Sequence, residues 1–525
     1  MSVIALILIL FAATAGLRLL ADRLRIPLPT LLVMGGLIIA FIPGLPHLTL
    51  DPGAIFLIFI PPLLFWASLT TSLRDLKRNF RSITLLAVCL VLVTMIVVAA
   101  VTHALLPEIP WAVCFVLGAI VSPPDAVAVI ASTRRLKLPR TTLAVLEGES
   151  LMNDATALVA YQIALTAAVT GTFSLSHASI EFVLTSAGGI AIGLALGWCV
   201  GWVRLHIARS SVVENTISLL SPFLAFIPAN ALGCSGVLAV VAMGLFLGRR
   251  GPRVVTAETR LQGTAMWEVL TFLLEGLIFI FVGLQLPEVI GALDAAEIGK
   301  LVGVSFAIAA TMIAARLLWI FPGAYLPQWI RGQIGHAKAS YPPWRHVLFA
   351  GWAGIRGGDS LIIALALPYA GAHGTPLAGR AVVIFITFVV ILVTLVAQGF
   401  TLAPLIRVLG IAADTEDDAE ERFARKNSIR AGAAAVESVT GADESERKTR
   451  AELHGLATHE LERLNGAEAA PAPRLRLRLA MIAAQREAII AMRDRDEISD
   501  KVMRRLQGEF DHEETLLHQR YGKSR

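Results

Sequence analysis

Thirteen stretches of this chain are apolar enough to cross a lipid bilayer, and this feature restricts the fold more than any other. A helix needs about 20 mostly apolar residues to span the hydrocarbon core. The chain is 56% hydrophobic and only 16% charged, which excludes an ordinary soluble globular protein of 525 residues. We therefore predict an all-α integral membrane protein with about thirteen transmembrane helices, in the windows 2–20, 27–44, 53–71, 83–105, 111–131, 148–170, 179–203, 214–231, 234–249, 266–287, 300–326, 346–369 and 378–408.

Two interpretations are open for 214–249, where Asn230, Gly233 and Gly236 interrupt an apolar run: one long helix or two. The charges of the loops test the count independently, because Lys and Arg gather in short cytoplasmic loops. Loops after odd-numbered windows hold nearly all of these residues, whereas the other loops offer only Lys300 and Arg380. This alternation predicts an N-terminus outside the cell and a C-terminus in the cytoplasm.

The composition changes after about residue 410, which predicts two regions: a transmembrane domain over 1–410 and a cytoplasmic tail over 411–525. In the tail, apolar residues such as Leu453, Leu456, Ile482 and Ile489 recur at near-helical spacing, and a Pro-Ala stretch at 468–473 breaks the run. We expect two or more amphipathic helices with a regulatory role. The chain contains no phosphate-binding or nucleotide fingerprint, so we predict no cofactor and no use of ATP. Positive loops that face anionic lipid account for the basic pI, so we predict no nucleic-acid partner.

Two windows carry signals for helices that break at membrane depth. Pro123 and Pro124 each lack a backbone N–H and obstruct the preceding turn. Gly354, Gly357 and Gly358 favour a similar break seven windows later. A pair of interrupted helices in corresponding halves of a chain indicates a transporter with inverted repeats and a binding site at the membrane midplane.

Ionisable residues inside these windows are candidates for function, because each costs about 2.5–3.5 kcal/mol to place at the centre of a membrane helix. Ser150 and Asp154 are four residues apart, so they share one helix face. A carboxylate, a hydroxyl and exposed carbonyls suit a small hard cation. Asp154 can also hold a proton, and competition of H+ with a metal cation for one carboxylate is itself an exchange mechanism.

We expect three further charged residues to support the site rather than bind the ion. We expect Glu149 to pair with Arg356, which would neutralise both and connect the sixth window to the twelfth. Asp125 follows the Pro-Pro break, where a carboxylate can compensate the N-terminal dipole of the second half-helix.

Around these residues the sequence resembles the bacterial branch of the monovalent cation:proton antiporter family, the sodium/proton exchangers. The resemblance covers the whole membrane part and rests on five motifs in the family's order: Phe59-Ile-Pro-Pro-Leu-Leu-Phe65, Gly118-Ala-Ile-Val-Ser-Pro-Pro-Asp125, Gly148-Glu-Ser-Leu-Met-Asn-Asp154, Gly276-Leu-Ile-Phe-Ile-Phe-Val-Gly-Leu-Gln285 and Trp352-Ala-Gly-Ile-Arg-Gly357.

The resemblance implies roles for four residues. Asp154 would bind the cation and the proton, Ser150 would be a ligand, and Pro124 would contribute its backbone carbonyl. Asn153 beside Asp154 is typical of electroneutral one-for-one exchangers. The resemblance also implies a homodimer in the bacterial inner membrane, a mobile six-helix core that moves against a dimerisation domain, and a role in pH homeostasis.

Three positions depart from the family pattern. Trp66 stands where many members have an acidic residue, Glu275 stands where Asn is common, and Asp359 replaces an apolar residue. We expect Glu275 and Asp359 to pair with Arg316 or to face a water-filled funnel, and to modulate pH dependence or cation preference.

The sequence thus predicts a secondary-active antiporter, not an enzyme, that exchanges Na+, or Li+ or K+, for H+. One alternative is a K+/H+ antiporter that serves pH or K+ homeostasis. Another is a cation channel, although paired broken helices suit alternating access better than an open filter. A third is a membrane ion sensor that signals through the tail.

Overall fold

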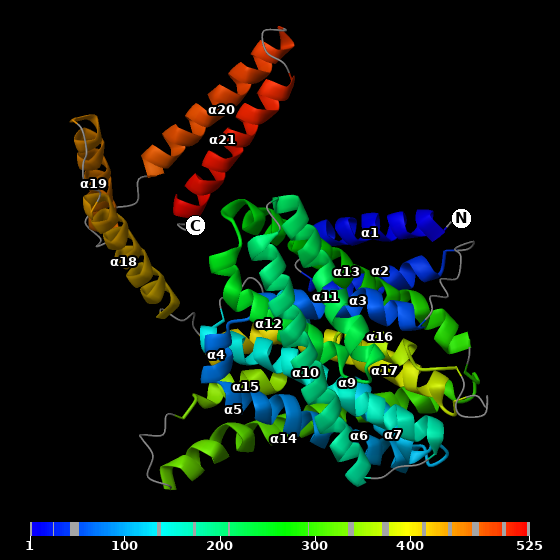
Figure 1. Ribbon diagram of the computed structural model, residues 1–525. Coiled ribbons are helices and arrows are strands. Elements are labelled where there is room, and N and C mark those ends of the chain that lie inside the picture. The colour runs from blue at the N-terminus through cyan, green and yellow to red at the C-terminus, as the bar shows by residue number, and fades with distance from the viewer. Residues whose placement is uncertain are drawn as a thin grey trace. The chain divides into compact units, whose positions relative to one another are not determined.

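The computed structural model describes residues 3–24, 26–42, 52–133, 138–171, 175–207, 210–291, 293–333, 341–369, 377–411, 416–438, 444–464, 472–495 and 500–521. Every regular element in these residues is helical (Figure 1). The chain divides into two compact units, Met1–Ala413 and Asp414–Arg525. The boundary lies close to the composition change near residue 410.

The helices of the first unit follow the apolar windows closely. They are α1 (Val3–Leu24), α2 (Leu28–Ala40), α3 (Pro52–Thr70), α4 (Leu73–Arg78), α5 (Phe80–Thr84), the π-helix η1 (Leu85–Leu90), α6 (Val91–Leu105), α7 (Trp111–Val121), α8 (Ala126–Thr133), α9 (Arg140–Thr170), α10 (Leu175–His206), α11 (Ser211–Ala231), α12 (Gly236–Val254), α13 (Ala257–Gly291), α14 (Ile298–Gln333), α15 (Trp344–Trp352), α16 (Gly358–Leu365) and α17 (Arg380–Leu409).

Each predicted window therefore coincides with one helix, with consecutive helical pieces or with a broken pair. The interrupted run 214–249 forms two helices, α11 and α12, because Gly233 turns the chain with a φ of 69°. By length and hydropathy alone, seven helices in the described residues are able to cross a membrane. The number thirteen and the orientation of the termini stay predictions, and Arg25, Arg134, Arg135, Lys137, Arg209 and Lys338 of the positive loops lie outside the described residues.

The surface of the first unit is that of a protein in a hydrocarbon solvent. Large apolar side chains such as Leu19, Leu184, Trp198 and Leu318 are exposed. Many exposed apolar side chains of this size would promote aggregation in water but are favourable against lipid.

The helices form two groups. The first group consists of α1–α3 and α10–α13, which pack mainly on one another. The second group consists of α5 to α9 and α14–α17. Glycines bring backbones close together at several contacts: an ideal Cβ at Gly36 of α2 would lie 2.1 Å from the carbonyl oxygen of Ile280 in α13. Small residues at helix interfaces are the usual means of close packing in membranes. Both broken helices belong to the second group.

The second unit consists of two helical pairs, α18 (Glu416–Ser438) with α19 (Glu444–Leu464) and α20 (Ala472–Asp494) with α21 (Asp500–Tyr521) (Figure 1). Ion pairs such as Arg478–Glu513, with an N–O distance of 2.6 Å, connect α20 to α21. Ile482 and Ile489 are buried, as expected for the apolar face of an amphipathic helix. Most of the Pro-Ala stretch lies outside the described residues.

Candidate functional site: the crossing of two broken helices

The two predicted breaks are present and meet each other. Residues 122–125 separate α7 from α8, and residues 353–357 separate α15 from α16. The backbone N–H of Asp125 donates a hydrogen bond of 2.8 Å to the carbonyl oxygen of Ile355. The two irregular segments therefore cross at this point and satisfy part of each other's backbone, which membrane depth requires.

Asp125 occupies the N-terminus of α8, as its position after the prolines predicts. Its Oδ1 accepts hydrogen bonds from the N–H groups of Val127 at 2.7 Å and Ala128 at 3.3 Å. The Ser150 hydroxyl of α9 accepts another from Ala126 at 3.3 Å. A carboxylate and a hydroxyl thus satisfy N–H groups that a helix start leaves without intrahelical partners.

A small cavity lies beside the crossing. Its volume is about 20 Å³, which is enough for roughly one water-sized particle. Three carboxylates line it, those of Asp125, Asp154 and Asp359, together with the Pro123-Pro124 segment and apolar residues of α3. Within the described residues, neither Asp154 nor Asp359 has a hydrogen-bond donor or a cationic partner.

Asn153 lies next to Asp154 but points into the crossing. It is completely buried, and its Nδ2 donates to the carbonyl oxygen of Pro124 at 3.2 Å. Its Oδ1 has no hydrogen-bond partner among the described residues. The structure thus brings together Asp154, Asn153, Ser150 and Pro124. The described residues contain no cluster of three His, Cys, Asp or Glu side chains spaced for a metal.

The expected pair of Glu149 with Arg356 is wrong. Glu149 instead forms a bidentate ion pair with Arg316 of α14, whose Nη1 and Nη2 reach the two carboxylate oxygens. Nη2 and Nε of Arg316 also donate to the carbonyl oxygen of Ala350 in α15, at 2.9 and 3.2 Å. Both residues are only 1% exposed.

Arg356 is held by backbone dipoles. Its Nε donates to the carbonyl oxygen of Val121, and its Nη1 donates to that of Gly354, both at 2.6 Å. Val121 ends α7, where carbonyl groups lack intrahelical partners and the helix dipole is negative. The breaks therefore supply hydrogen-bond acceptors for this guanidinium, and no carboxylate of the described residues forms an ion pair with it. The sequence signal for the correct pair was the single Arg in the window 300–326.

Of the three positions that depart from the family pattern, Asp359 lines the small cavity at the crossing, and Trp66 and Glu275 do not. Trp66 stacks on Trp267 of α13, with ring centroids 5.8 Å apart, and does not line the cavity. Glu275 is partly buried on α13, close enough to Asp125 and Asp359 for their charges to interact. The expected pairing of Glu275 and Asp359 with Arg316 is not formed, because Glu149 occupies that guanidinium.

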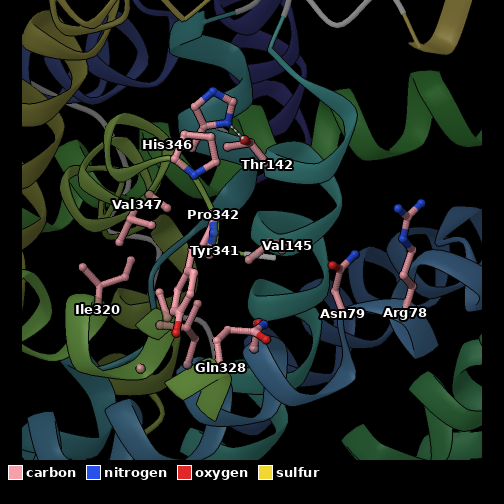
Figure 2. Close-up of a pocket in the computed structure, with 16 residues that line it drawn as sticks. Arg78, Asn79, Thr142, Val145, Ile320, Gln328, Tyr341, Pro342, His346 and Val347 are labelled. Carbon is pink, nitrogen blue, oxygen red and sulfur yellow. Dashed lines mark hydrogen bonds between the residues drawn. The ribbon is translucent and has the colours of Figure 1, made fainter. Parts of the chain in front are cut away.

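A second cavity of about 360 Å³ lies between α5, α9, α14 and α15. Figure 2 shows Thr142 and His346 facing each other there, with Oγ1 and Nδ1 3.4 Å apart. Its wall includes Ala350, the acceptor for Arg316, and Val145, one turn from Glu149. This cavity therefore approaches the Glu149–Arg316 pair, and no acidic side chain of the described residues lines it.

A membrane helical bundle in which two broken helices cross beside a buried carboxylate defines a class of protein, the secondary transporters with a midplane site. The model of the transmembrane sodium/hydrogen exchanger family matches residues 7–408. The chain therefore belongs to this family of cation/proton antiporters and is a multi-pass membrane protein.

Individual relatives agree with the family. An uncharacterized Na+/H+ exchanger of Mycobacterium tuberculosis is 35% identical over 98% of this chain and 96% of its own length. A sodium, potassium, lithium and rubidium/H+ antiporter of Bacillus subtilis is 36% identical over 71% of this chain and 56% of its own length. The sodium proton antiporter MjNhaP1 from Methanocaldococcus jannaschii has the same fold, with a TM-score of 0.60 and 22% identity over 78% of this chain and 98% of its own.

Proposed function

We propose that this protein exchanges Na+ for H+ across the bacterial inner membrane, and that both ions compete for the carboxylate of Asp154. The observation that carries the proposal is the small cavity at the crossing, where Asp154 has neither a hydrogen-bond donor nor a cation among the described residues. Because the cavity has room for about one water-sized particle, a cation must lose most of its hydration shell to enter. The carboxylate and nearby protein oxygens would replace that shell.

The roles of the neighbours follow from their contacts. Asp125 and Ser150 hold the start of α8, and Asn153 fixes the carbonyl of Pro124. We propose that the Pro124 carbonyl and the Ser150 hydroxyl are ligands and that Asp125 is a supporting residue. Asp359 and Glu275 place two further carboxyl groups near the pathway and, when ionised, would raise the local cation concentration.

K+/H+ exchange is the second candidate. The relative from Bacillus subtilis carries potassium, lithium and rubidium in its name besides sodium. Oxygen ligation suits all these ions, and selectivity depends on cavity size and ligand geometry. Proton exchange with a series of monovalent cations in proteoliposomes would decide between them.

The substitution Asp154→Asn tests the proposal. It removes the charge that binds either ion, so cation-dependent dissipation of a pH gradient in everted vesicles should fall to the level of vesicles without the protein. The matched control is Asp22→Asn, which affects an exposed pair with Arg18 on α1 and should leave transport unchanged. Full activity of the Asp154 variant would remove this residue from the site.

Homodimer formation, alternating access by movement between the two helix groups, and regulation by residues 411–525 are further parts of this proposal. Each rests on the family resemblance.

A further inference from the structure

A large apolar groove lies where the two groups of helices meet. Its volume is about 1200 Å³, above the range of roughly 300–1000 Å³ typical of small-molecule pockets. Its walls come from α4, α5, η1 and α9 on one side and from α10 and α12 on the other. The lining is mostly hydrocarbon and includes Val88, Leu151, Ile190, Leu194 and Leu245.

The packing of α10 explains why this space is open. Gly189 and Gly193 face α12 so closely that an ideal Cβ would lie 2.4 Å from the carbonyl oxygen of Ser235 and 2.1 Å from that of Ala239. Glycines at four-residue spacing let two membrane helices approach closely. Since α10 packs tightly on α12 and only sparsely on α9, a gap is left between α10 and α9.

One end of the groove is positively charged. Arg249 and Arg250, near the end of α12, line this end and are exposed. The guanidinium carbon of Arg250 lies 4.6 Å from the ring centroid of Phe246, another lining residue. Within the described part of the chain, no acidic side chain pairs with either arginine. The distribution of positive loops predicts that this end faces the cytoplasm, where anionic lipids give the membrane its negative surface potential.

We propose that this groove binds the acyl chains of an anionic phospholipid from the bilayer and that Arg249 and Arg250 bind its phosphate headgroup. The apolar depth matches hydrocarbon chains, and the two arginines at one end match a phosphate. The groove touches α9, which carries Asp154, and also α10 and α12 of the other helix group. A lipid held there contacts both groups and can influence their relative movement.

Lipid retention by the purified full-length protein tests this proposal. Phosphatidylglycerol is added in detergent, with phosphatidylcholine as the neutral comparison, and bound lipid is counted by native mass spectrometry alongside thermal unfolding. Wild type should bind and be stabilised by phosphatidylglycerol selectively. Arg249→Gln with Arg250→Gln should weaken this binding about thirtyfold, since each arginine near an anionic headgroup contributes about fivefold.

The matched control is Arg345→Gln with Arg407→Gln. These arginines are also exposed, and Arg345 likewise lies over an aromatic ring, that of Trp344, but neither lines the groove. The control should bind phosphatidylglycerol as wild type does. Equal binding of the two lipids by wild type, or equal losses in the two double variants, would overturn the proposal.

A photo-crosslinking amino acid in place of Leu194 identifies the occupant in native membranes. The expected product carries the mass of one phospholipid; attachment to a tail peptide or to a second copy of the chain would assign the groove to that occupant instead. The Asp154→Asn variant should keep wild-type lipid binding, so failure of the transport proposal would not affect this test.

Discussion

Glu149 and Arg316 place two charges in the interior of the second helix group, and their geometry explains how the protein tolerates them. The guanidinium makes two parallel contacts to the carboxylate and donates its remaining hydrogen bonds to Ala350. Such a pair stabilises a fold only when nearly all of its donors and acceptors are satisfied. The pair connects α9 to α14 and, through Ala350, to α15.

Removal of either charge of this pair should therefore lower the stability of the protein strongly. We expect Arg316→Gln or Glu149→Gln to destabilise the protein by about 3–5 kcal/mol, because each leaves an unpaired buried charge. The double variant should recover much of this loss. Thermal unfolding in detergent measures the effect, and Lys300→Met, which breaks an exposed pair with Glu108, serves as a control with little change. A double variant that is no more stable than either single variant would contradict the pairing.

At the scale of elements, the crossing depends on how closely two irregular segments approach. An ideal Cβ at Gly357 would lie 2.0 Å from Oδ2 of Asp125. The φ of Gly357 is −93°, so the need for glycine here comes from the close approach and not from its conformation. The carboxylate that starts α8 thus lies against the residue that precedes α16.

Gly357→Ala should displace the crossing. We expect cation/proton exchange to fall at least about tenfold, because misplacement of a site by about 1 Å is sufficient for large losses in activity. Exchange by reconstituted protein, normalised to folded protein, measures this. Gly303→Ala in α14 is the matched control, since no atom of the described residues lies within 4 Å of its ideal Cβ; it should be neutral or slightly stabilising. Unchanged exchange in the Gly357 variant would show that the crossing tolerates movement.

At the scale of the whole molecule, the charge moved in each cycle depends on how many ionisable groups bind the ions. Asn153 carries no charge and contributes its amide to Pro124. If Asp154 alone carries either one cation or one proton, the loaded forms have equal charge and exchange is electroneutral.

Exchange by wild type should therefore not respond to an imposed membrane potential. Asn153→Asp should lose at most part of the activity, because a protonated Asp can still donate to the Pro124 carbonyl. Proton flux in proteoliposomes with and without a potassium diffusion potential measures both expectations. A current generated by wild type would refute electroneutral exchange.

The positions of the helices and of their breaks could be predicted from the sequence, because they depend on residues that are neighbours in the chain. Apolar length predicted the helices, because every backbone group in a membrane must be satisfied within a helix or by a neighbour. The two prolines and the glycines near 354–358 predicted the breaks, since they act on their own turn of helix. The position of Asp125 at a helix start followed from the same local rule, and so did the helical tail.

Contacts between segments that are far apart in the sequence could not be predicted and became clear only from the tertiary structure. The sequence favoured Arg356 as the partner of Glu149, whereas the structure places Arg316 of α14 against Glu149 and lets Arg356 donate to the carbonyl oxygen at the end of α7. The meeting of Asp125 with Ile355, the cavity with three carboxylates and the groove beside α10 likewise depend on how helices far apart in sequence pack. Helices and their breaks could thus be read from the chain, because they depend on neighbouring residues, whereas the charges that meet at the breaks depend on the packing of helices that are far apart in the sequence.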